Sequence, residues 1–442
     1  MRILDNISSL YIDFDAFFAN VEKQLNPDTW HYPVGVTPFP SEHSSLIAQC
    51  YVAKAYGLHR GMKVSEAKVI CPDLRVITAR HNVYVEIHHK IIAAIEKHIS
   101  VKKVWSVDEM ECDFGARDDE SCLSLTRKIK AQIAEDIGPH ITPSIGLSSC
   151  NLLAKIAAEM KKPNGFEVLH PRDLPGKLLE VPLRDIPGIA TNMELRLNRA
   201  GIQTMEDFWN ISAKQARAIW RSVEGERIWW MIHGYPVEKI PPKRSMFGHS
   251  RQLSGEWTTP KRAEDCLRLL TAQAARRMRK EGFLATKLNI SLRTLDENRI
   301  SKEVRFSPAR DDYTLLRKMR MAFWACLDMA QSDRLRFARP GTLRVRQVHI
   351  TLHGLTTKGA FTDNLFSKTE DRKKQDNLSR LSDVIDQTNQ KYQSNILTIG
   401  PQEQPPGDYA GGKIAFGRIP DAMAYAKRVQ LNGKDKRRPK AS

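Results

Sequence analysis

The stretch Trp105-Ser106-Val107-Asp108-Glu109-Met110-Glu111-Cys112-Asp113-Phe114 places two neighbouring carboxylates between segments that favour β-strands. Adjacent residues of a regular strand point to opposite faces, so Asp108 and Glu109 can share one ligand only if the backbone turns or bulges there. We therefore predict a hairpin with two acids at its tip. Such a tip suits a divalent cation, because Mg²⁺ takes oxygen ligands, usually one or two carboxylates together with substrate phosphates. The alternative is a solvated turn.

Composition predicts a soluble, cytoplasmic chain of three or four domains. The chain has 442 residues, of which 41% are hydrophobic and 27% are charged. No apolar run approaches the roughly 18 residues of a membrane span, and Asp5 interrupts the region where a signal peptide needs an apolar core. The seven cysteines are scattered and never form a CxxC pair. This argues against a disulfide framework or a cysteine-type zinc site and fits a reducing compartment.

The net charge of +18 is concentrated in one segment. Residues 241–355 contain 24 Lys and Arg against 11 Asp and Glu, a net charge of +13. A basic module on a moderately charged body indicates a polyanionic partner, with nucleic acid as the first candidate. A merely solubilising surface would not need this concentration.

The first 170 residues predict a layered α/β unit. A buried strand at 10–12 leads to Asp13, at a strand end where such layers concentrate ligand sites. Asp15 is a candidate N-cap for a helix that follows. The turn-rich insertion 26–80 contains Tyr51 and Lys54 on one helix face, where they could hold a triphosphate or form a solvated pair. Further helices are expected at 82–100, 120–137 and 150–162, and a strand is expected at 142–145.

Residues 176–238 read as helical, with short loops. Within them, Ile186-Pro187-Gly188-Ile189-Ala190 resembles a helix-hairpin-helix, whose glycine turn exposes backbone N–H groups to a DNA phosphate. Ala190 stands where the motif usually has a second glycine.

The basic module predicts the order strand, helix, two strands, helix, strand. Its helices are expected at 260–281 and 312–331, and its later strands near 304–306 and 343–346. In the strand after the first helix, apolar residues alternate with Lys287, Asn289, Ser291 and Arg293. Such a sheet leaves one basic face free to track phosphates without reading bases. Beyond residue 355 we expect a partly disordered extension with one helix at 378–392.

Taken together, these stretches resemble the Y-family translesion DNA polymerases, in the group of bacterial polymerase IV and the catalytic subunit of polymerase V. The resemblance covers residues 8–355 and follows the family's motif order. The motifs are YIDFDAFFA (11–19), AKAYGLHRGM (53–62) with CPDL (71–74), SVDE (106–109), SIG (144–146) with LAKIA (153–157) and KPNG (162–165), the Ile186-Pro187-Gly188 hairpin, and GHSR (248–251).

The resemblance implies an α+β, multidomain, right-hand polymerase. Its parts are a catalytic palm (1–30 and 81–170), small fingers (31–80), a helical thumb with the helix-hairpin-helix (171–240), a linker (241–246), a βαββαβ little finger (247–355) and a C-terminal extension (356–442).

The resemblance also implies site residues. Asp13, Asp108 and Glu109 would bind two Mg²⁺ ions, or Mn²⁺ in their place, with the Phe14 carbonyl as a further ligand. Phe18 falls at the steric gate that excludes ribonucleotides. Phe17, Tyr51, Lys54 and Lys162 match nucleotide contacts, with Lys54 where the family usually has Arg. The expected DNA contacts are Gly188, Ala190, Arg251, Lys287, Arg293, Arg344 and Arg346.

The expected function is low-fidelity, DNA-templated addition of deoxynucleotides to a primer 3′ end, with bypass of damaged bases in bacterial DNA repair and SOS mutagenesis near the nucleoid. The alternatives are a catalytically weak or inactive DNA-binding adaptor in a mutagenesis complex, and a helix-hairpin-helix DNA-structure binder or nuclease. The latter leaves the N-terminal motifs unexplained. Primer–template DNA and deoxynucleoside triphosphates are the expected partners. Thr362-Asp363-Asn364-Leu365-Phe366 keeps the Leu-Phe pair of a sliding-clamp peptide but lacks its Gln, so a locally packed loop is the alternative.

Overall fold

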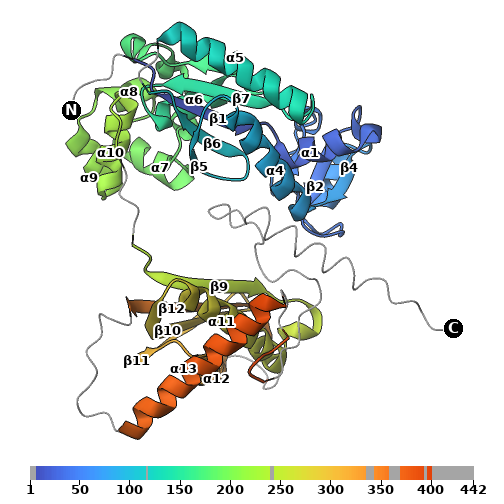
Figure 1. The fold of residues 1–442 in the computed structure, drawn as a ribbon, viewed down its shortest axis with the longest axis vertical. Helices are drawn as coiled ribbons and strands as arrows, with labels where there is room; N and C mark the ends of the chain where they lie inside the picture. The colour runs from blue at the N-terminus through green and yellow to red at the C-terminus, as the bar shows by residue number, and fades with distance from the viewer. Residues whose placement is uncertain are drawn as a thin grey trace, which may run out of the picture. The chain divides into compact units, whose positions relative to one another are not determined.

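A computed structural model describes residues 6–115, 118–238, 243–334, 343–357, 369–392 and 396–400. The chain forms two compact bodies that divide at residue 240 (Figure 1). Within the described ranges, no helix combines the length and apolar character needed to cross a membrane.

A five-stranded sheet forms the centre of the first body, in the order β5-β6-β1-β7-β8. The fully buried β1 lies in the middle and pairs antiparallel with β6 and β7, while β7 and β8 are parallel. The strands are β1 (Ser9–Phe14), β5 (Val101–Val104), β6 (Glu109–Asp113), β7 (Pro143–Ser148) and β8 (Phe166–Val168).

Helices cover the two faces of this sheet differently. Apolar side chains of β1, β6 and β7 pack with α4 (His81–Glu96) and α5 (Asp119–Asp136) in one core. The helix α6 (Asn151–Met160) crosses the other, more polar face, where Tyr11 packs against its alanines. Gly146 permits this close approach, because a Cβ there would lie only 1.9 Å from the Ala154 carbonyl oxygen. The predicted layered unit is confirmed.

Two smaller groups of elements flank the central sheet on opposite sides (Figure 1). On one side, α1 (Phe17–Leu25) packs on a three-stranded sheet with the order β3-β2-β4. Besides α1, the elements of this flanking group are η1 (Pro27–Thr29), β2 (Val34–Thr37), β3 (Ala48–Gln49), α2 (Tyr51–Ala55), α3 (Val64–Ile70) and β4 (Arg75–Thr78). Gly57 ends α2 at φ +83°, the left-handed conformation for which glycine is suited.

The other flank is helical, as predicted for residues 176–238. Its core is continuous with the apolar side of α6, and Ser149 Oγ donates to the Gly234 carbonyl at 2.9 Å. The first helix of the expected helix-hairpin-helix is replaced by short 3₁₀ turns. The elements are η2 (Pro171–Asp173), η3 (Gly176–Glu180), η4 (Leu183–Asp185), α7 (Thr191–Arg199), α8 (Met205–Asn210), α9 (Ala213–Trp220) and α10 (Val223–Ile232).

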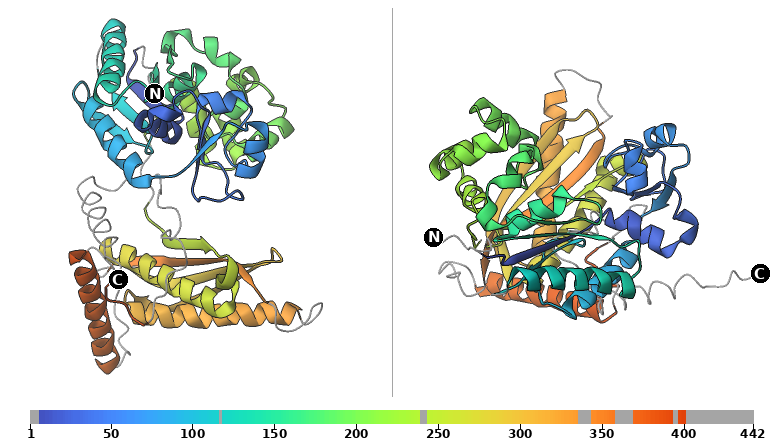
Figure 2. Two further views of the ribbon diagram at one scale, coloured as in Figure 1. Left: turned by 90° about the vertical axis from the view of Figure 1, so that its right-hand side faces the viewer. Right: turned by 90° about the horizontal axis from the view of Figure 1, so that it is seen from above.

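The second body has the predicted βαββαβ order, in an antiparallel sheet arranged β11-β10-β12-β9. Both long helices lie on the same side of this sheet (Figure 2), where Leu288, Ile290 and Leu292 are buried against them. The strand expected at 343–346 is much longer, because alternation of apolar and polar residues continues to Thr357. The elements are β9 (Met246–Gln252), η5 (Gly255–Thr258), α11 (Pro260–Lys280), β10 (Phe283–Thr294), β11 (Arg299–Ala309), α12 (Asp312–Arg334) and β12 (Val345–Thr357).

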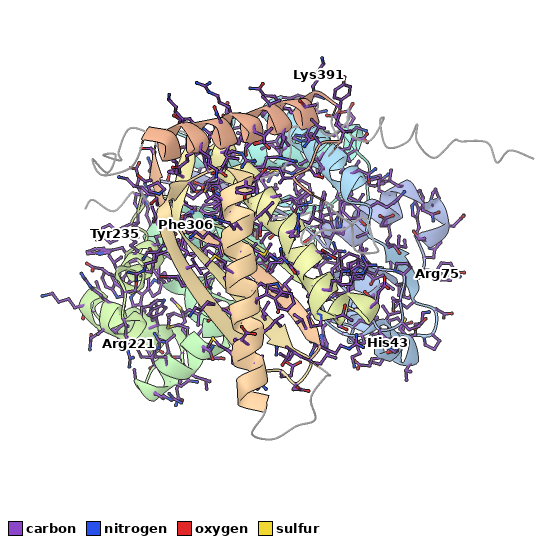
Figure 3. All side chains as sticks on the ribbon, turned by 90° about the horizontal axis from the view of Figure 1, so that it is seen from below. His43, Arg75, Arg221, Tyr235, Phe306 and Lys391 are labelled. Carbon is purple, nitrogen blue, oxygen red and sulfur yellow. The ribbon has the colours of Figure 1, made fainter. Side chains whose placement is uncertain are left out.

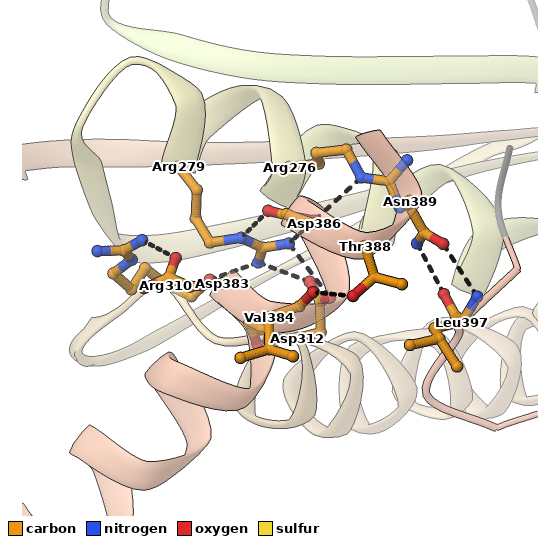
Figure 4. A network of polar contacts seen from close by, with 11 residues as sticks. Arg276, Arg279, Arg310, Asp312, Asp383, Val384, Asp386, Thr388, Asn389 and Leu397 are labelled. Atoms are coloured by element: carbon orange, nitrogen blue, oxygen red, sulfur yellow. Dashed lines mark hydrogen bonds and ion pairs between the residues drawn. The ribbon is translucent and has the colours of Figure 1, made fainter. Parts of the chain in front are cut away.

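A further helix, α13 (Thr369–Lys391), crosses one end of α12 and starts nine residues earlier than predicted (Figure 3). Ion pairs hold it to the second body (Figure 4). The Arg279 side chain is only 2% exposed, and its nitrogens lie 2.7 Å from both Asp312 Oδ1 and Asp386 Oδ2. Arg276 Nε adds a 3.0 Å contact to Asp386. Charge pairing therefore docks a helix whose polar sequence indicated a loose extension.

Asp386→Ala is expected to lower the free energy of unfolding of the second body by about 3 kcal/mol, because a buried guanidinium loses one of its two carboxylates. Urea unfolding of the full chain followed by far-UV circular dichroism measures this loss. Asp376→Ala is the matched control, since it removes an exposed carboxylate from the same helix. Equal effects of the two substitutions would contradict the assignment.

Candidate active site

The predicted hairpin is confirmed, and its pairing with β1 brings the acids together. β5 ends at Val104 and β6 begins at Glu109, so Asp108 lies in the turn. In the antiparallel ladder Asp13 is directly opposite Glu109, and such partners project from the same face. The Phe14 N–H donates to the Asp108 carbonyl at 2.9 Å. These two pairings fix the hairpin tip against the end of β1.

One cavity of about 440 Å³ collects most of the predicted nucleotide and metal residues. Tyr51 stands beside it, with its ring 4.0 Å from Lys54 Nζ. Arg60 also lines the cavity. It lies within the motif 53–62, but it was not among the predicted nucleotide contacts, because an arginine in a turn-rich loop has no periodicity that indicates where its side chain points. The lining residues are Asp13, Phe14, Ala16, Phe17, Phe18, Ile47, Ala48, Gln49, Lys54, Arg60, Ser106, Asp108, Glu109 and Lys162.

The carboxylates of the cavity sit where negative charge is costly. Burial raises the pKa of Asp13 to about 8, against the lowering effect of the Lys162 ammonium. Burial also raises the pKa of Asp108, although a hydrogen bond from Ser106 opposes that shift. Lys162 Nζ lies 2.6 Å from Asp13 Oδ1, and Lys155 pairs with Glu109. Additional cations would therefore be stabilised among these groups.

The cations of the cavity crowd one another. Burial and the nearby Lys162 ammonium lower the pKa of Lys54, and burial raises the pKa of Tyr51 to about 12. Although burial lowers it, the Asp13 and Glu159 carboxylates raise the pKa of Lys162 above its ordinary value. Neighbouring ammonium groups, with the Arg60 guanidinium on the same cavity wall, suit a polyanion such as a triphosphate.

Phe18 is held rigidly in the wall of this cavity. Its ring stacks on Tyr84 with centroids 4.4 Å apart and planes inclined by 16°. The Tyr84 hydroxyl donates to Glu22 Oε1 at 2.7 Å, and Arg80 pairs with the same buried carboxylate. The ring is 8% exposed, so its position is set before any ligand arrives.

Asp15 does not cap α1, and that prediction is wrong. The cap position is Ala16, at φ 44°, so the carboxylate points away from the helix start. It accepts instead from Ser144 Oγ at 2.8 Å, Thr142 Oγ1 at 3.1 Å and the Asn164 N–H at 2.6 Å. Asp15 thereby joins β1, β7 and the loop after α6, the loop that carries Lys162.

The donor set fits a divalent metal by its chemistry. Three carboxylates and the Phe14 carbonyl offer oxygen ligands, the type that Mg²⁺ prefers. Across the described ranges, no three His, Cys, Asp or Glu side chains converge into a metal-holding group. In this arrangement two of the three acids form ion pairs with lysine ammonium groups, Asp13 with Lys162 and Glu109 with Lys155.

Comparisons with known proteins point to one family. Residues 12–159 match the impB/mucB/samB family and residues 244–365 match its C-terminal domain. DNA polymerase IV of Saccharolobus solfataricus is 33% identical over 256 residues, which cover 57% of this chain and 72% of that protein. The chain belongs to the Y family of translesion DNA polymerases. Its enzyme class, DNA-directed DNA polymerase, follows from that membership.

Two further comparisons extend over most of this Y-family polymerase. DNA polymerase IV of Moorella thermoacetica is 29% identical over 408 residues, covering 89% of this chain and 96% of that protein. The structure of a Y-family chimera of the Dbh and Dpo4 polymerases matches with a TM-score of 0.63 at 24% identity, covering 79% of this chain and 100% of the other. The latter likeness shows the α+β, multidomain fold. Family members generally use divalent metal ions.

The predicted DNA contacts of the polymerase are divided between exposed loops and the two sheet faces. Lys287 and Arg293 lie on the open face of the second sheet, in register with Arg305 and Arg299 of β11. Arg293 and Arg346 both pair with Glu297.

Other predicted DNA contacts lie elsewhere. Arg251 is opposite Val348, on the helix-covered face, so the structure does not bring it to the open face. Arg344 is exposed beside Thr258. Gly188 and Ala190 are exposed at the start of α7. Gly188 uses φ +99°, whereas Ala190 has φ −93°, a value that needs no glycine.

The hairpin of the polymerase also depends on a buried histidine. His88 of α4 is 1% exposed, and its Nδ1–H donates to the Val107 carbonyl at 2.7 Å. Burial lowers the pKa of His88 to about 4. The stability it contributes is complete above its ordinary pKa of about 6.5 and is lost as the pH falls towards 4.

His88→Asn is expected to flatten the fall in unfolding free energy between pH 6.5 and 4, because protonation of His88 accounts for about 3 kcal/mol of that fall. Asparagine keeps a donor for Val107 without titrating. Urea unfolding at a series of pH values measures the change. His43→Asn removes an exposed histidine and serves as the control. If both variants keep the wild-type pH profile, His88 does not cause the acid sensitivity.

Proposed function

We propose that this chain extends primers on DNA templates by two-metal nucleotidyl transfer and tolerates damaged template bases at low fidelity. The observation that carries the proposal is the single cavity lined by Asp13, Asp108 and Glu109 together with Lys54, Arg60 and Lys162. Carboxylates for metal ions and cations for a triphosphate are what phosphoryl transfer needs in one place.

The chain's own residues would position the substrate. Two Mg²⁺ ions, when held by the three carboxylates and the Phe14 carbonyl, supply charge neutralisation at the attacking and leaving oxygens. Lys54, Arg60 and Lys162 bind and orient the phosphates of a deoxynucleoside triphosphate. Lys162 contacts Asp13 now, so loading requires its ammonium to exchange that carboxylate for a phosphate oxygen. Phe18 faces the sugar and excludes a 2′-hydroxyl.

The DNA would be held by backbone contacts. Gly188 and Ala190 are exposed at the start of α7, beside a second cavity of about 1140 Å³ between α6 and the thumb. Lys287 and Arg293 on the open face of the little finger suit phosphates of the duplex. We also propose the cytoplasmic, nucleoid-associated setting and the role in SOS mutagenesis expected from the family.

Primer extension with purified protein tests the proposal. The expected result is extension of an annealed primer in Mg²⁺ or Mn²⁺, including past an abasic site that blocks a high-fidelity polymerase. DNA binding without any extension would favour the alternative, a DNA-binding adaptor. The clamp-like segment Thr362–Phe366 lies outside the described residues, as does most of the extension 356–442, and the sliding clamp stays a hypothesis.

Arg60 is expected to compensate for the lysine at position 54. Arg60→Ala should raise the KM for the incoming nucleotide roughly tenfold, because a charge-assisted phosphate contact is lost. Steady-state single-nucleotide insertion measures this. Arg75→Ala is the control, since Arg75 is exposed on β4 and lies over the Tyr32 ring, 4.3 Å from its centroid. An unchanged KM for Arg60→Ala would leave Lys54 and Lys162 as the phosphate ligands.

A further inference from the structure

The indole of Trp105 lies on the palm face that carries the catalytic carboxylates. It packs against the cluster formed by Tyr11, Ala154 and Ala158, and Tyr11 precedes Asp13 by two residues on β1 and therefore shares its face. The indole Nε1–H donates to Glu111 Oε2 at 3.1 Å. Its backbone N–H donates to the Glu109 carbonyl at 2.9 Å, which closes the hairpin. The half-buried ring is thus fixed within the catalytic hairpin.

A lysine covers this ring. Lys103 Nζ lies 3.4 Å from the ring centroid of Trp105, and Lys103 is exposed. The preceding Lys102 is engaged differently, because its Nζ lies 3.4 Å from carboxylate oxygens of both Glu111 and Asp113. An exposed ammonium over an aromatic ring is a combination that serves nucleic-acid strands, with the ring for apolar contact and the cation for phosphate.

The position of Trp105 relative to the nucleotide cavity identifies which strand it meets. Phe18, on that cavity's wall, follows Asp13 in the chain, whereas Tyr11 precedes it on the strand. Lys155 contacts Glu109 and the Tyr11 hydroxyl and lines the palm–thumb cavity. In phosphoryl transfer the attacking and leaving oxygens are roughly in line. The attacking 3′ oxygen must therefore approach from the side of Tyr11 and Trp105.

We propose that Trp105 and Lys103 seat the primer-terminal nucleotide: the Lys103 ammonium leaves the indole face to bind the 5′ phosphate of that nucleotide, and the deoxyribose takes its place against the ring. The inference rests on the proposed polymerase function and adds a site for the primer end. The terminal base is paired with the template and stacked on its neighbour, so its sugar is the part left open for an apolar contact. Deoxyribose offers a C–H surface that fits an indole face.

A phosphate-substitution cycle tests the ammonium contact without catalysis. Primer–template affinity is measured by fluorescence anisotropy without nucleotide or divalent metal. Replacing the phosphate 5′ to the terminal nucleotide by a neutral methylphosphonate should weaken wild-type binding roughly fivefold. In Lys103→Ala the same replacement should have no effect, and the dependence of log Kd on log salt should fall by about one. Lys102→Ala removes an equal charge from the same strand and should respond like wild type.

A second pair of variants tests the indole. Trp105→Ala should weaken primer–template binding and lower kcat roughly tenfold, because the 3′ oxygen loses its orientation, while the KM for nucleotide stays constant. Trp105→Phe should restore most of the affinity and of kcat, since it keeps an aromatic face. Because phenylalanine cannot donate to Glu111, this result would show that the ring and not the hydrogen bond is responsible. Thermal unfolding of each variant verifies that it folds.

The outcomes separate this inference from the function on which it rests. Absence of primer extension by wild-type protein would remove the proposed function. If wild type extends primers, the seat is overturned by equal methylphosphonate effects in wild type and Lys103→Ala, or by coupling of Lys103 to a different phosphate. It is also overturned if folded Trp105→Ala keeps wild-type DNA affinity and kcat.

Discussion

Asp108→Asn is expected to reduce primer extension about 10³-fold or more, because Asp108 is proposed to bind metal and would then supply several kcal/mol of charge stabilisation in the transition state. The acid sits in the turn, in the cavity that also contains Asp13 and Glu109. Single-turnover extension with saturating nucleotide measures the loss directly. Asp113→Asn is the matched control, since this carboxylate is on the same hairpin but 51% exposed and paired with Lys102.

Stability should change in the opposite direction from activity. Burial raises the pKa of Asp108, so the charged carboxylate opposes folding at every pH above the ordinary value of about 3.9. The amide removes that cost, and the thermal midpoint of the metal-free variant at neutral pH should equal or exceed that of wild type. Added Mg²⁺ should raise the midpoint of wild type by mass action and raise that of the variant less. Full extension activity in Asp108→Asn would refute the metal assignment.

Local patterns were enough to predict most elements but not their partners. The hairpin at Asp108, the helix after Gly188 and the βαββαβ order all follow from turn residues and periodicity near each site. The pairing of Asp13 with Glu109 joins distant segments and was not predicted, since the family resemblance implied only that the two acids share a metal site. Arg60 reaches the cavity from a loop that is held to Leu46, whose carbonyl accepts from the Gly61 N–H at 2.8 Å, and no spacing rule predicts that contact.

The errors have specific physical causes. Asp15 precedes a helix and has a capping side chain, yet three hydrogen bonds from Thr142, Ser144 and Asn164 outweigh one cap. Arg251 lies on the helix-covered face because it is the ladder partner of Val348, which is on that face. The positive charge of a residue does not indicate on which face of a sheet its side chain lies. The start of α13 was missed because its first residues are polar and show no apolar stripe, and the helix is held to the second body through its Asp386 carboxylate, which pairs with Arg276 and Arg279.

Phe18→Ala is expected to raise incorporation of ribonucleotides relative to deoxynucleotides by roughly 100-fold. The wall of the nucleotide cavity loses a ring that Tyr84 holds at 4.4 Å, so the space for a 2′-hydroxyl opens. Relative kcat/KM for matched ribo- and deoxynucleotides on one template measures the change. Phe18→Tyr keeps the ring and should keep the discrimination.

A variant of Tyr84 tests whether Phe18 excludes the 2′-hydroxyl because it is held rigidly or only because it is bulky. Tyr84→Phe keeps the stacked ring but removes the hydroxyl that binds Glu22, so it loosens Phe18 without shrinking it. If rigidity matters, Tyr84→Phe should lose part of the sugar discrimination while Phe18 is unchanged. If bulk alone matters, only Phe18→Ala will lose discrimination. An unchanged sugar preference in Phe18→Ala would show that another side chain of the cavity excludes the 2′-hydroxyl. Phe17 is the next residue to test in that event, because it lines the same wall and its ring centroid lies 5.9 Å from that of Phe18.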